Sequence, residues 1–502
     1  MTNPLFDALT AAPEEALWLE NHDGRRFTYG DLKALSGRLA SALLDYGVEA
    51  GDRVAVQVEK SPEAIALYLA TVRIGAVFLP LNTAYTPAEV AYFLGDAEPR
   101  LFVTSPEKLQ SAESVAAEDG AALASLGTDG RSGSLMQKAL GLAPMAGAAQ
   151  RAPEDLAAIL YTSGTTGRSK GAMLTHGNLL SNSLILKDYW RFTERDVLIH
   201  ALPVYHTHGL FVAVNILALA GGSLIFMPKF EAAAVLAALP RATSLMGVPT
   251  FYTRLAQEPG FNKETTAGIR LLISGSAPLL AETHAQVFQK TGHAVLERYG
   301  MTETNMNTSN PYEGERRAGT VGFPLPGVSL RVVDPDTGRP LKAGEVGMIE
   351  VKGPNVFKGY WRQPEKTASE HRADGFFITG DLGVIDPDGY VSIVGRGKDL
   401  IITGGLNVYP KEVEGEIDAL DGVIESAVIG LAHPDLGEAV TAVVAIGQAR
   451  PPSEESILKP LETRLAAFKR PKRVLFVSDL PRNTMGKVQK NVLREQHKDL
   501  FC

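Results

Sequence analysis

The chain has 502 residues, of which 45% are hydrophobic and 21% are charged, and its formal net charge is −8. This length predicts two to four domains with a large buried core, and the composition excludes a disordered or fibrous protein. The negative charge argues against a nucleic-acid-binding protein, which needs a cationic surface for phosphates. The single cysteine, Cys502, excludes an internal disulfide and is poorly placed for catalysis at a terminus.

The N-terminal sequence MTNPLFDALTAAPEEALWLE carries acidic residues and no basic segment, so we expect no signal peptide and a cytoplasmic protein. Residues 210–227 are uncharged, which raises the question of a membrane span. Asn215 and the pair Gly221 and Gly222 interrupt this stretch, and such interruptions favour a helix, a turn and a strand of a buried α/β core. We therefore expect no membrane partner.

Two patterns alternate in the first hundred residues. Helical spacing over residues 28–44 and 62–73 alternates with apolar runs at 52–58 and 76–81, as in parallel βαβ units. Residues 111–152 are rich in Ala, Gly and Ser, and we predict a surface excursion with one helix. The alternation resumes over 156–333, with strands expected near 157–161, 197–201, 223–227 and 271–274.

The sequence pattern changes after Gly319, where short β runs separated by turns predict an antiparallel, barrel-like subdomain. Past Arg396, helices near 412–420 and 454–467 alternate with strands near 425–430, 440–446 and 473–476. The predicted fold class is α/β, with a large N-terminal body of parallel βαβ subdomains and a small α+β C-terminal domain. The predicted domains are residues 1–396 and residues 397–502.

A loop rich in glycine and hydroxyl groups, YTSGTTGRSKG at residues 161–171, directly follows an apolar strand. Glycines let the backbone approach a ligand closely, and the N–H groups and hydroxyls form a nest for phosphate oxygens. The P-loop pattern of NTPases is absent, because Lys170 is followed by Gly171 and not by Ser or Thr. The predicted phosphate-binding residues are Thr162, Ser163, Gly164, Thr165, Thr166, Gly167 and Lys170.

The segment YTSGTTGRSKGAMLTH resembles the signature loop of the acyl-adenylate-forming superfamily, which includes AMP-forming acyl-CoA synthetases, luciferases and adenylation domains of peptide synthetases. Further motifs follow in the family's order: YGMTE at 299–303, TGD at 379–381, GRGKD at 395–399, GGLNVYP at 404–410 and PRNTMGK at 481–487. The resemblance covers residues 27–494. It implies ATP and CoA as co-substrates and Mg²⁺ as the metal ion.

The resemblance also implies individual roles around the nucleotide. Thr302 contacts the α-phosphate and Glu303 holds Mg²⁺, a metal that takes one or two carboxylates when it binds nucleotide phosphates. Tyr299 faces the adenine, and Asp381 and Arg396 contact the ribose. Taken alone, Asp381 also fits a turn residue. The remaining residues expected in this site are Ser276, Ala277, Gly300 and Met301.

The family's small C-terminal domain is mobile and carries a catalytic lysine, which the resemblance places at Lys487. There it bridges the substrate carboxylate and the α-phosphate and stabilises the charge that develops in the transition state. Taken alone, it also fits an ordinary surface lysine. The resemblance implies that Lys398 is the hinge about which the C-terminal domain rotates. It also implies that Gly404 and Gly405 line a tunnel for CoA. A protein acetyltransferase acting on Lys487 is a candidate partner, because this lysine is acetylated in the wider family.

The acyl pocket of the family is built from four segments, here 205–209, 247–254, 274–277 and 299–310. Together with Arg298, which directly precedes the last segment, they supply His206, Thr207 and Arg254, whereas a long-chain or aryl pocket would be apolar. Arginine is suited to a buried second carboxylate, so these residues indicate a dicarboxylic substrate.

The sequences of these segments resemble those of malonyl-CoA synthetases, which implies malonate as the acid. On this resemblance Arg254 anchors the free carboxylate, with Ser276 and Arg298 beside it. Thr207 and Met306 bound the space around C2 and decide whether methylmalonate enters. Three alternatives stay open: Arg254 as an exposed salt-bridge residue, Arg298 pointing away from the ligand, and His206 as a core histidine instead of a catalytic or gating residue.

The resulting hypothesis is an AMP-forming ligase that converts malonate, ATP and CoA to malonyl-CoA through malonyl-AMP. The alternatives are an acyl-CoA synthetase for another short acid, a stand-alone adenylation enzyme that loads a carrier protein, and a nucleotide-binding scaffold without chemistry.

Overall fold

The computed structural model describes residues 2–118, 120–162, 169–403, 406–447, 453–483 and 486–501. The chain forms two compact units, and each is described by itself. Unit 1 comprises Met1–Ser329 and Val351–Phe377, and unit 2 comprises Leu330–Glu350 and Ile378–Cys502. The predicted domain boundary between residues 396 and 397 lies inside unit 2 and stays a prediction.

Unit 1 contains a seven-stranded sheet of order β18-β8-β7-β4-β3-β5-β6. Strands β3 to β7 pair in parallel, whereas β8 and β18 join the edge antiparallel. The strands are β3 (Arg53–Gln57), β4 (Val77–Pro80), β5 (Leu101–Thr104), β6 (Ala122–Ser125), β7 (Leu156–Thr162), β8 (Lys170–Thr175) and β18 (Gly359–Tyr360). The helices of this part of the chain are α2 (Tyr29–Asp45), α3 (Pro62–Arg73), α4 (Pro87–Ala97), α5 (Leu109–Glu118), α6 (Ser134–Leu140) and α12 (Pro364–Ser369).

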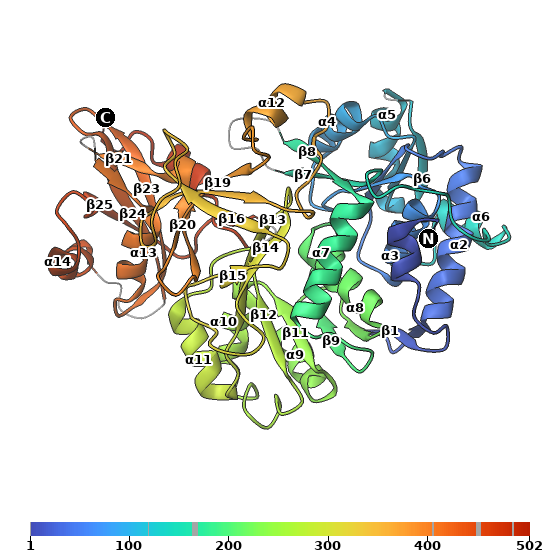
Figure 1. Ribbon diagram of the computed structural model, residues 1–502, viewed down its shortest axis with the longest axis horizontal. Coiled ribbons are helices and arrows are strands. Elements are labelled where there is room, and N and C mark those ends of the chain that lie inside the picture. Colours follow the sequence, from blue (N-terminus) through green and yellow to red (C-terminus); the bar gives the residue numbers. More distant parts are fainter. Residues whose placement is uncertain are drawn as a thin grey trace. The chain divides into compact units, whose positions relative to one another are not determined.

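A second sheet in unit 1 has nine strands in the order β15-β14-β13-β12-β11-β9-β10-β1-β2. Its middle strands are parallel, and β9, β11 and β12 lie side by side in the green part of Figure 1. The strands are β1 (Leu17–Asn21), β2 (Arg26–Thr28), β9 (Val197–His200), β10 (Ser223–Phe226), β11 (Ser244–Gly247), β12 (Leu271–Ser274), β13 (Leu296–Met301), β14 (Asn305–Ser309) and β15 (Phe323–Pro324).

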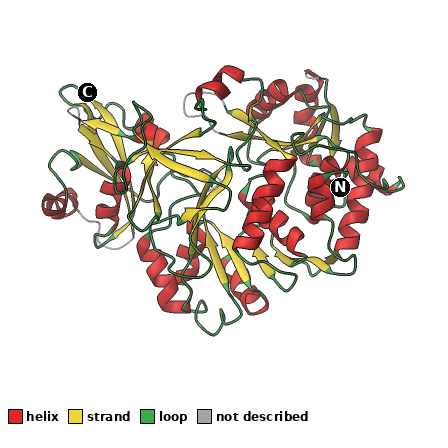
Figure 2. Ribbon diagram, viewed as in Figure 1, coloured by secondary structure: helices red, strands yellow, loops and turns green. Residues whose placement is uncertain are grey.

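Helices accompany the strands of both sheets in unit 1 (Figure 2). Those not yet named are α1 (Pro4–Leu9), α7 (His176–Tyr189), the π-helix η2 (His208–Val214), α8 (Asn215–Ala220), α9 (Ala232–Ala238), α10 (Pro249–Gln257) and α11 (Ala281–Thr291), with the short 3₁₀ turns η1 (Pro106–Lys108) and η3 (Leu239–Arg241). The predicted parallel α/β body is therefore confirmed.

Local sequence explains where the predicted helices start. The Thr28 hydroxyl accepts from the backbone N–H of Asp31, whose carboxylate accepts from the Thr28 N–H, and this capping box begins α2. Ser61 caps α3 in a similar way, with Pro62 at the first helical position, where its missing N–H is not needed. Both helices were expected at these places from their spacing.

The prediction for residues 111–152 was wrong in part. The structure places α5, β6 and α6 across this region, so the βαβ pattern continues there. Ala112 and Ala116 are buried on α5, and Ala124 on β6. Alanine contributes little contrast between a buried and an exposed face, which is why the spacing gave a weak signal.

The uncharged stretch 210–227 follows the expected helix, turn and strand. The π-helix η2 runs into α8, Gly221 ends α8 in the left-handed conformation, and β10 follows. Among the described residues, no helix is both long and apolar enough to cross a membrane.

Unit 2 contains most residues of a four-stranded sheet of order β16-β17-β19-β20, where the antiparallel module was predicted. Its strands are β16 (Ser329–Val333), β17 (Gly347–Lys352), β19 (Phe377–Ile385) and β20 (Val391–Arg396), followed by the 3₁₀ turn η4 (Gly397–Asp399). A five-stranded sheet joins β22, β21, β24 and β23 in that order, with β25 on β24. The remaining elements are β21 (Ile401–Thr403), β22 (Leu406–Val408), α13 (Pro410–Asp418), β23 (Val423–His433), β24 (Gly437–Ile446), α14 (Glu454–Arg464), β25 (Arg473–Val477) and α15 (Lys490–Gln496).

Candidate active site

The four predicted pocket segments follow or include the carboxyl ends of β9, β11, β12 and β13, which are neighbours in one sheet. Parallel strands present their carboxyl ends along the same edge, so segments that are far apart in sequence meet there. This edge is where open α/β sheets bind their ligands.

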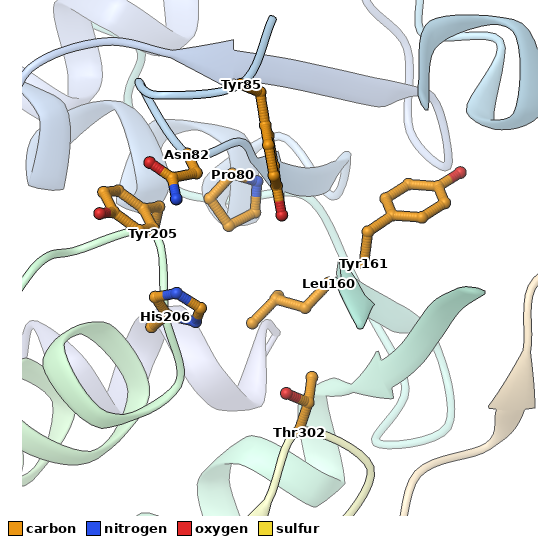
Figure 3. A pocket seen from close by; sticks show the side chains of 8 residues that line it. All are labelled: Pro80, Asn82, Tyr85, Leu160, Tyr161, Tyr205, His206 and Thr302. Atoms are coloured by element: carbon orange, nitrogen blue, oxygen red, sulfur yellow. The ribbon is translucent and has the colours of Figure 1, made fainter. Parts of the chain in front are cut away.

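A pocket in unit 1 joins this edge to the carboxyl end of the seven-stranded sheet. Figure 3 shows His206, Leu160 and Thr302 facing the same space, whereas the ring of Tyr161 extends away from them. The pocket is lined by Pro80, Asn82, Tyr85, Leu160, Tyr161, Tyr205, His206 and Thr302. Two predicted catalytic residues, His206 and Thr302, which follow strands of the nine-stranded sheet, therefore share one cavity with residues of the seven-stranded sheet.

His206 is half-buried in this pocket, with its ring centroid 5.0 Å from that of Tyr205. Burial lowers the pKa of His206 to about 4, so the ring is neutral at neutral pH. A neutral imidazole can donate or accept a hydrogen bond, but it contributes no positive charge to substrate binding.

Arg298 lies on β13 and is 4% exposed. Its Nε and Nη2 atoms have no hydrogen-bond partner in the described part of the chain. Burial lowers the pKa of Arg298 to about 9, which leaves the guanidinium charged at neutral pH. A buried cation without a partner is costly, and an anionic ligand would relieve that cost.

Ser276 follows Gly275 in the chain segment after β12, and its φ of +72° is unusual for a residue with a side chain. Its hydroxyl is 3.2 Å from Nδ1 of the buried His208. The neighbouring Gly275 leaves room for the arginine, because a Cβ there would lie 2.2 Å from Cζ of Arg298. Gly275 therefore makes room for the guanidinium, and the hydroxyl of the next residue, Ser276, pairs with a buried histidine.

Arg254, the predicted anchor of the free carboxylate, is exposed near the end of α10. No ion pair joins it to a carboxylate among the described residues, so the salt-bridge alternative has no support in the structure. Burial thus separates the two arginines: Arg298 is inside and Arg254 is at the surface.

Glu303 is 6% exposed, and its Oε1 accepts hydrogen bonds from Thr162 Oγ1 at 3.3 Å and from Tyr360 Oη at 3.1 Å. No group of three or more His, Cys, Asp or Glu side chains that could cage a metal occurs among the described residues. One buried carboxylate flanked by hydroxyls fits Mg²⁺, which keeps waters and takes most of its ligands from phosphates.

Lys170 starts β8 and is 9% exposed. Its Nζ lies 3.4 Å from Oε1 of Glu370 and 4.7 Å from the centroid of the Tyr360 ring. The predicted phosphate-binding lysine therefore contacts the same tyrosine whose hydroxyl donates to Glu303.

The remaining predicted residues of unit 1 fall at the same sheet edge. Tyr299 is buried on β13, and Gly300 makes a tight turn possible, since a Cβ there would lie 1.8 Å from the backbone oxygen of Asn305. Thr207 and Met306 are buried, and Ala277 and Met301 are partly exposed. The predicted residues Ser163, Gly164, Thr165, Thr166 and Gly167 lie outside the described residues.

In unit 2, Asp381 on β19 faces Arg396 on β20, and Nε of the arginine lies 2.8 Å from Oδ1 of the aspartate. The two predicted ribose contacts are therefore paired with each other. Lys398 is exposed in η4, next to Asp399, which pairs with Arg494. Gly404 and Gly405 lie outside the described residues.

Lys487 is exposed in a turn closed by the β-bridge between Arg482 and Val488. Its backbone N–H donates to Oδ1 of Asn483 at 2.9 Å, and its carbonyl accepts from the Asn483 N–H at 2.9 Å. Backbone contacts thus hold the position of the lysine independently of its side chain.

Sequence reasoning missed several residues. Pro80, Asn82 and Tyr85 line the pocket from the loop after β4, and the position of that loop at the end of a predicted parallel strand was the available signal. His208, Tyr360 and Glu370 carried no motif signal, because their roles depend on contacts between distant segments.

Comparison with known proteins decides the family. Residues 6–361 match the AMP-binding enzyme family, and residues 412–487 match the AMP-binding enzyme C-terminal domain. The chain belongs to the AMP-binding enzyme family. The resemblance inferred from the motifs is confirmed.

Similar proteins cover 94% or more of the chain. The crystal structure of ATP-bound MatB from Rhodopseudomonas palustris has a TM-score of 0.98 and 62% identity, covering 100% of both chains. The malonate–CoA ligase of Arabidopsis thaliana is 34% identical and covers 94% of this chain and 85% of its own. The feruloyl-CoA synthase of an Amycolatopsis species is 35% identical, with 95% of each chain covered. The predicted fold class is confirmed by the first of these.

Proposed function

We propose that this protein is an AMP-forming ligase that joins malonate to CoA at the expense of ATP. Malonate attacks the α-phosphate of ATP, pyrophosphate leaves, and the thiol of CoA displaces AMP from malonyl-AMP. The observation that carries the choice of acid is the buried Arg298, whose Nε and Nη2 have no partner in the described part of the chain. The names of the malonate–CoA ligase relative and of ATP-bound MatB support the same assignment.

The free carboxylate of malonate is assigned to Arg298, with Ser276 beside it, because a buried guanidinium binds a carboxylate with two parallel hydrogen bonds. Arg254 stays a prediction as a further contact, since it is exposed. Thr207 and Met306 are both buried and remain the residues proposed to limit substituents at C2. His206 lines the adjoining pocket as a neutral side chain.

ATP and CoA are proposed as co-substrates, with Mg²⁺ on Glu303 beside the hydroxyls of Thr162 and Thr302. The metal ion would neutralise phosphate charge. Lys487 is proposed to stabilise the charge that develops between the carboxylate and the α-phosphate. Rotation of a C-terminal domain about Lys398, acetylation of Lys487 and a cytoplasmic location remain predictions.

The relatives also include a feruloyl-CoA synthase, so the acid must be tested directly. The assay measures CoA-dependent AMP release with acetate, malonate, methylmalonate, succinate, hexanoate and benzoate. Malonate should give the highest kcat/KM, by about 100-fold or more over acetate, because an uncharged acid leaves the buried guanidinium unpaired. Faster turnover of acetate, hexanoate or benzoate would reject the dicarboxylate and keep the ligase.

Two variants and an alternative acyl acceptor extend this test. Arg298→Leu should lower kcat/KM for malonate by about 100-fold or more while the value for acetate changes little. Arg195→Leu removes an exposed arginine and serves as the matched control. Transfer to a carrier protein in place of CoA would support the stand-alone adenylation enzyme, and absence of any AMP release would support the scaffold without chemistry.

A further inference from the structure

A cluster of charged side chains surrounds the hydroxyl of Tyr360 in unit 1. Tyr360 Oη lies 2.7 Å from Oε2 of Glu370 and 3.1 Å from Oε1 of Glu303. Oε1 of Glu370 is in turn 2.6 Å from Nζ of Lys366 and 3.4 Å from Nζ of Lys170. One tyrosine therefore connects the carboxylate proposed for Mg²⁺ to the lysine proposed for the phosphates.

The position of Tyr360 is fixed by its surroundings. The side chain is 4% exposed, and its ring packs at right angles on Phe357, with centroids 4.8 Å apart. Its backbone N–H donates to the hydroxyl of Thr367 at 2.9 Å, which ties β18 to α12. The backbone N–H of Phe357 donates to the carbonyl of Glu303 at 2.7 Å, so the two segments are also joined directly.

The hydroxyl of Tyr360 has one proton and two carboxylate neighbours. A tyrosine hydroxyl keeps its proton at neutral pH, and Oη of Tyr360 lies within hydrogen-bond distance of both Glu370 and Glu303. A hydroxyl donates one hydrogen bond at a time, and the two carboxylates therefore compete for it. A cation on Glu303 draws charge from that carboxylate and makes it a weaker acceptor, so the hydroxyl still orients Glu303 but donates more to Glu370.

We propose that Tyr360 is a positioning residue, which holds Glu303 for Mg²⁺ and links that carboxylate through Glu370 to Lys170. The inference rests on the proposed function, since it takes Glu303 as the metal-binding carboxylate. Partners that orient a metal-binding carboxylate are worth about 10–100-fold in metal affinity or activity when removed.

The link through Glu370 predicts that metal and nucleotide bind cooperatively. When Mg²⁺ occupies Glu303, Tyr360 donates more to Glu370, and Glu370 becomes a weaker acceptor for Lys170. Lys170 is then released toward the phosphates. The reciprocal effect follows from linkage: nucleotide binding strengthens metal binding by the same factor.

The test measures binding, not turnover. Mn²⁺ replaces Mg²⁺ and is titrated by electron paramagnetic resonance in the presence of α,β-methylene-ATP, whose α–β bond does not react. Tyr360→Phe keeps the ring that packs on Phe357 and Lys170 and removes only the hydroxyl. We expect Mn²⁺ affinity to fall about 10-fold or more. The KM for malonate at saturating Mg²⁺ should stay within about twofold of the wild type.

Tyr29→Phe is the matched control. Its buried hydroxyl donates to the carbonyls of Leu217 and Gly222, and no metal or phosphate residue is involved. This variant reports the general cost of losing a buried tyrosine hydroxyl, so it should leave Mn²⁺ affinity unchanged. An equal loss in both tyrosine variants would mean that Tyr360 is only structural.

Glu370→Gln tests the second half of the link and remains informative if Tyr360→Phe does not fold. Lys170 loses its charged partner, so α,β-methylene-ATP should bind more tightly without metal, and the gain in its affinity on adding Mn²⁺ should shrink. An unchanged gain overturns the proposed link. Glu303→Gln separates the two hypotheses: if it leaves Mn²⁺ affinity intact, the metal assignment fails and the positioning role fails with it. If it weakens Mn²⁺ binding while Tyr360→Phe does not, only the positioning role fails.

Discussion

Burial distinguishes two arginines that look equivalent in the sequence. Arg254 occurs in a predicted acyl-pocket segment and Arg298 directly precedes another, and either one suits a carboxylate. In the structure only Arg298 is removed from solvent, and the charge it keeps at neutral pH has to be balanced inside the protein. The space for its guanidinium depends on one residue, Gly275, which has no side chain to occupy it.

Gly275→Ala should therefore impair malonate binding selectively. The added Cβ would lie 2.2 Å from Cζ of Arg298, and the flexible end of the arginine can shift more easily than the backbone. We expect the KM for malonate to rise about 10-fold, while the KM for ATP stays within about twofold. Steady-state kinetics with each substrate varied in turn measure both values.

Gly415→Ala is the control for this substitution, because a Cβ at Gly415 in α13 meets nothing within 4 Å. It should leave both KM values unchanged. A Gly275→Ala enzyme with normal malonate kinetics would show that the guanidinium does not need its observed position.

At the level of elements, hydrophobic spacing predicted α3 and β12 at the positions where the structure has them. It missed β14, whose five residues Asn305–Ser309 are all buried although most are polar. Only some of their polar groups have partners: Nδ2 of Asn355 donates to the carbonyl of Met306 and to Oδ1 of Asn307. In the described part of the chain, Oδ1 of Asn305, Nδ2 of Asn307 and Oγ1 of Thr308 are buried without a hydrogen-bond partner. A strand stabilised by side-chain amides has no apolar alternation to detect.

The site was predictable to the extent that its residues occur in ordered motifs. Thr302, Glu303 and Lys170 were predicted in this way; in the structure Thr302 lines the pocket, and Glu303 and Lys170 both contact Tyr360. Tyr360 and Glu370 were not found, because Tyr360 is 57 residues from Glu303 in the chain and meets it only when β18 pairs with β8. Contacts of this kind are properties of sheet order and not of local sequence.

The side chain of Lys487 can be removed without loss of the hydrogen bonds that hold its turn. Lys487→Ala preserves the backbone hydrogen bonds to Asn483 and the bond from Nη1 of Arg482 to the carbonyl of Gly486. We expect malonyl-AMP formation to fall about 100–1,000-fold, as when a group that stabilises transition-state charge is removed. Reaction of supplied malonyl-AMP with CoA should change less than about threefold.

Pyrophosphate release reports the first of these steps and thioester formation the second. Lys459→Ala removes an exposed lysine on α14 and should affect neither. Loss of thioester formation alone in Lys487→Ala would move the lysine to the second step of the reaction.

For the whole molecule, buried histidines make the stability of unit 1 depend on pH. Burial lowers the pKa of His176 to about 4 and brings the pKa values of His200 and His208 well below their ordinary range. In the unfolded chain a histidine titrates near pH 6.5, so below that pH the unfolded state binds more protons than the folded state. These groups stabilise the fold above about pH 6.5 and lose that contribution as the pH falls.

Unit 2 contains a group whose effect on stability changes with pH in the opposite direction. Burial raises the pKa of Asp418 to about 6, so the folded state binds the extra proton between the ordinary and the raised pKa. Its stabilising contribution is present at low pH and is lost as the pH rises toward about 6. A measurement on the whole chain would mix the two effects, and a probe confined to unit 1 is needed.

The tryptophans provide this probe, because Trp18, Trp190 and Trp361 all belong to unit 1. Urea unfolding followed by their fluorescence should show unit 1 losing stability between about pH 7 and about pH 5, with His176 alone contributing about 2 kcal/mol. His176→Gln should reduce the loss of stability between these two pH values by about this amount, since glutamine does not titrate. Equal stabilities at both pH values in the wild type would mean that the buried rings accept protons without unfolding, and would contradict their neutral state in the fold.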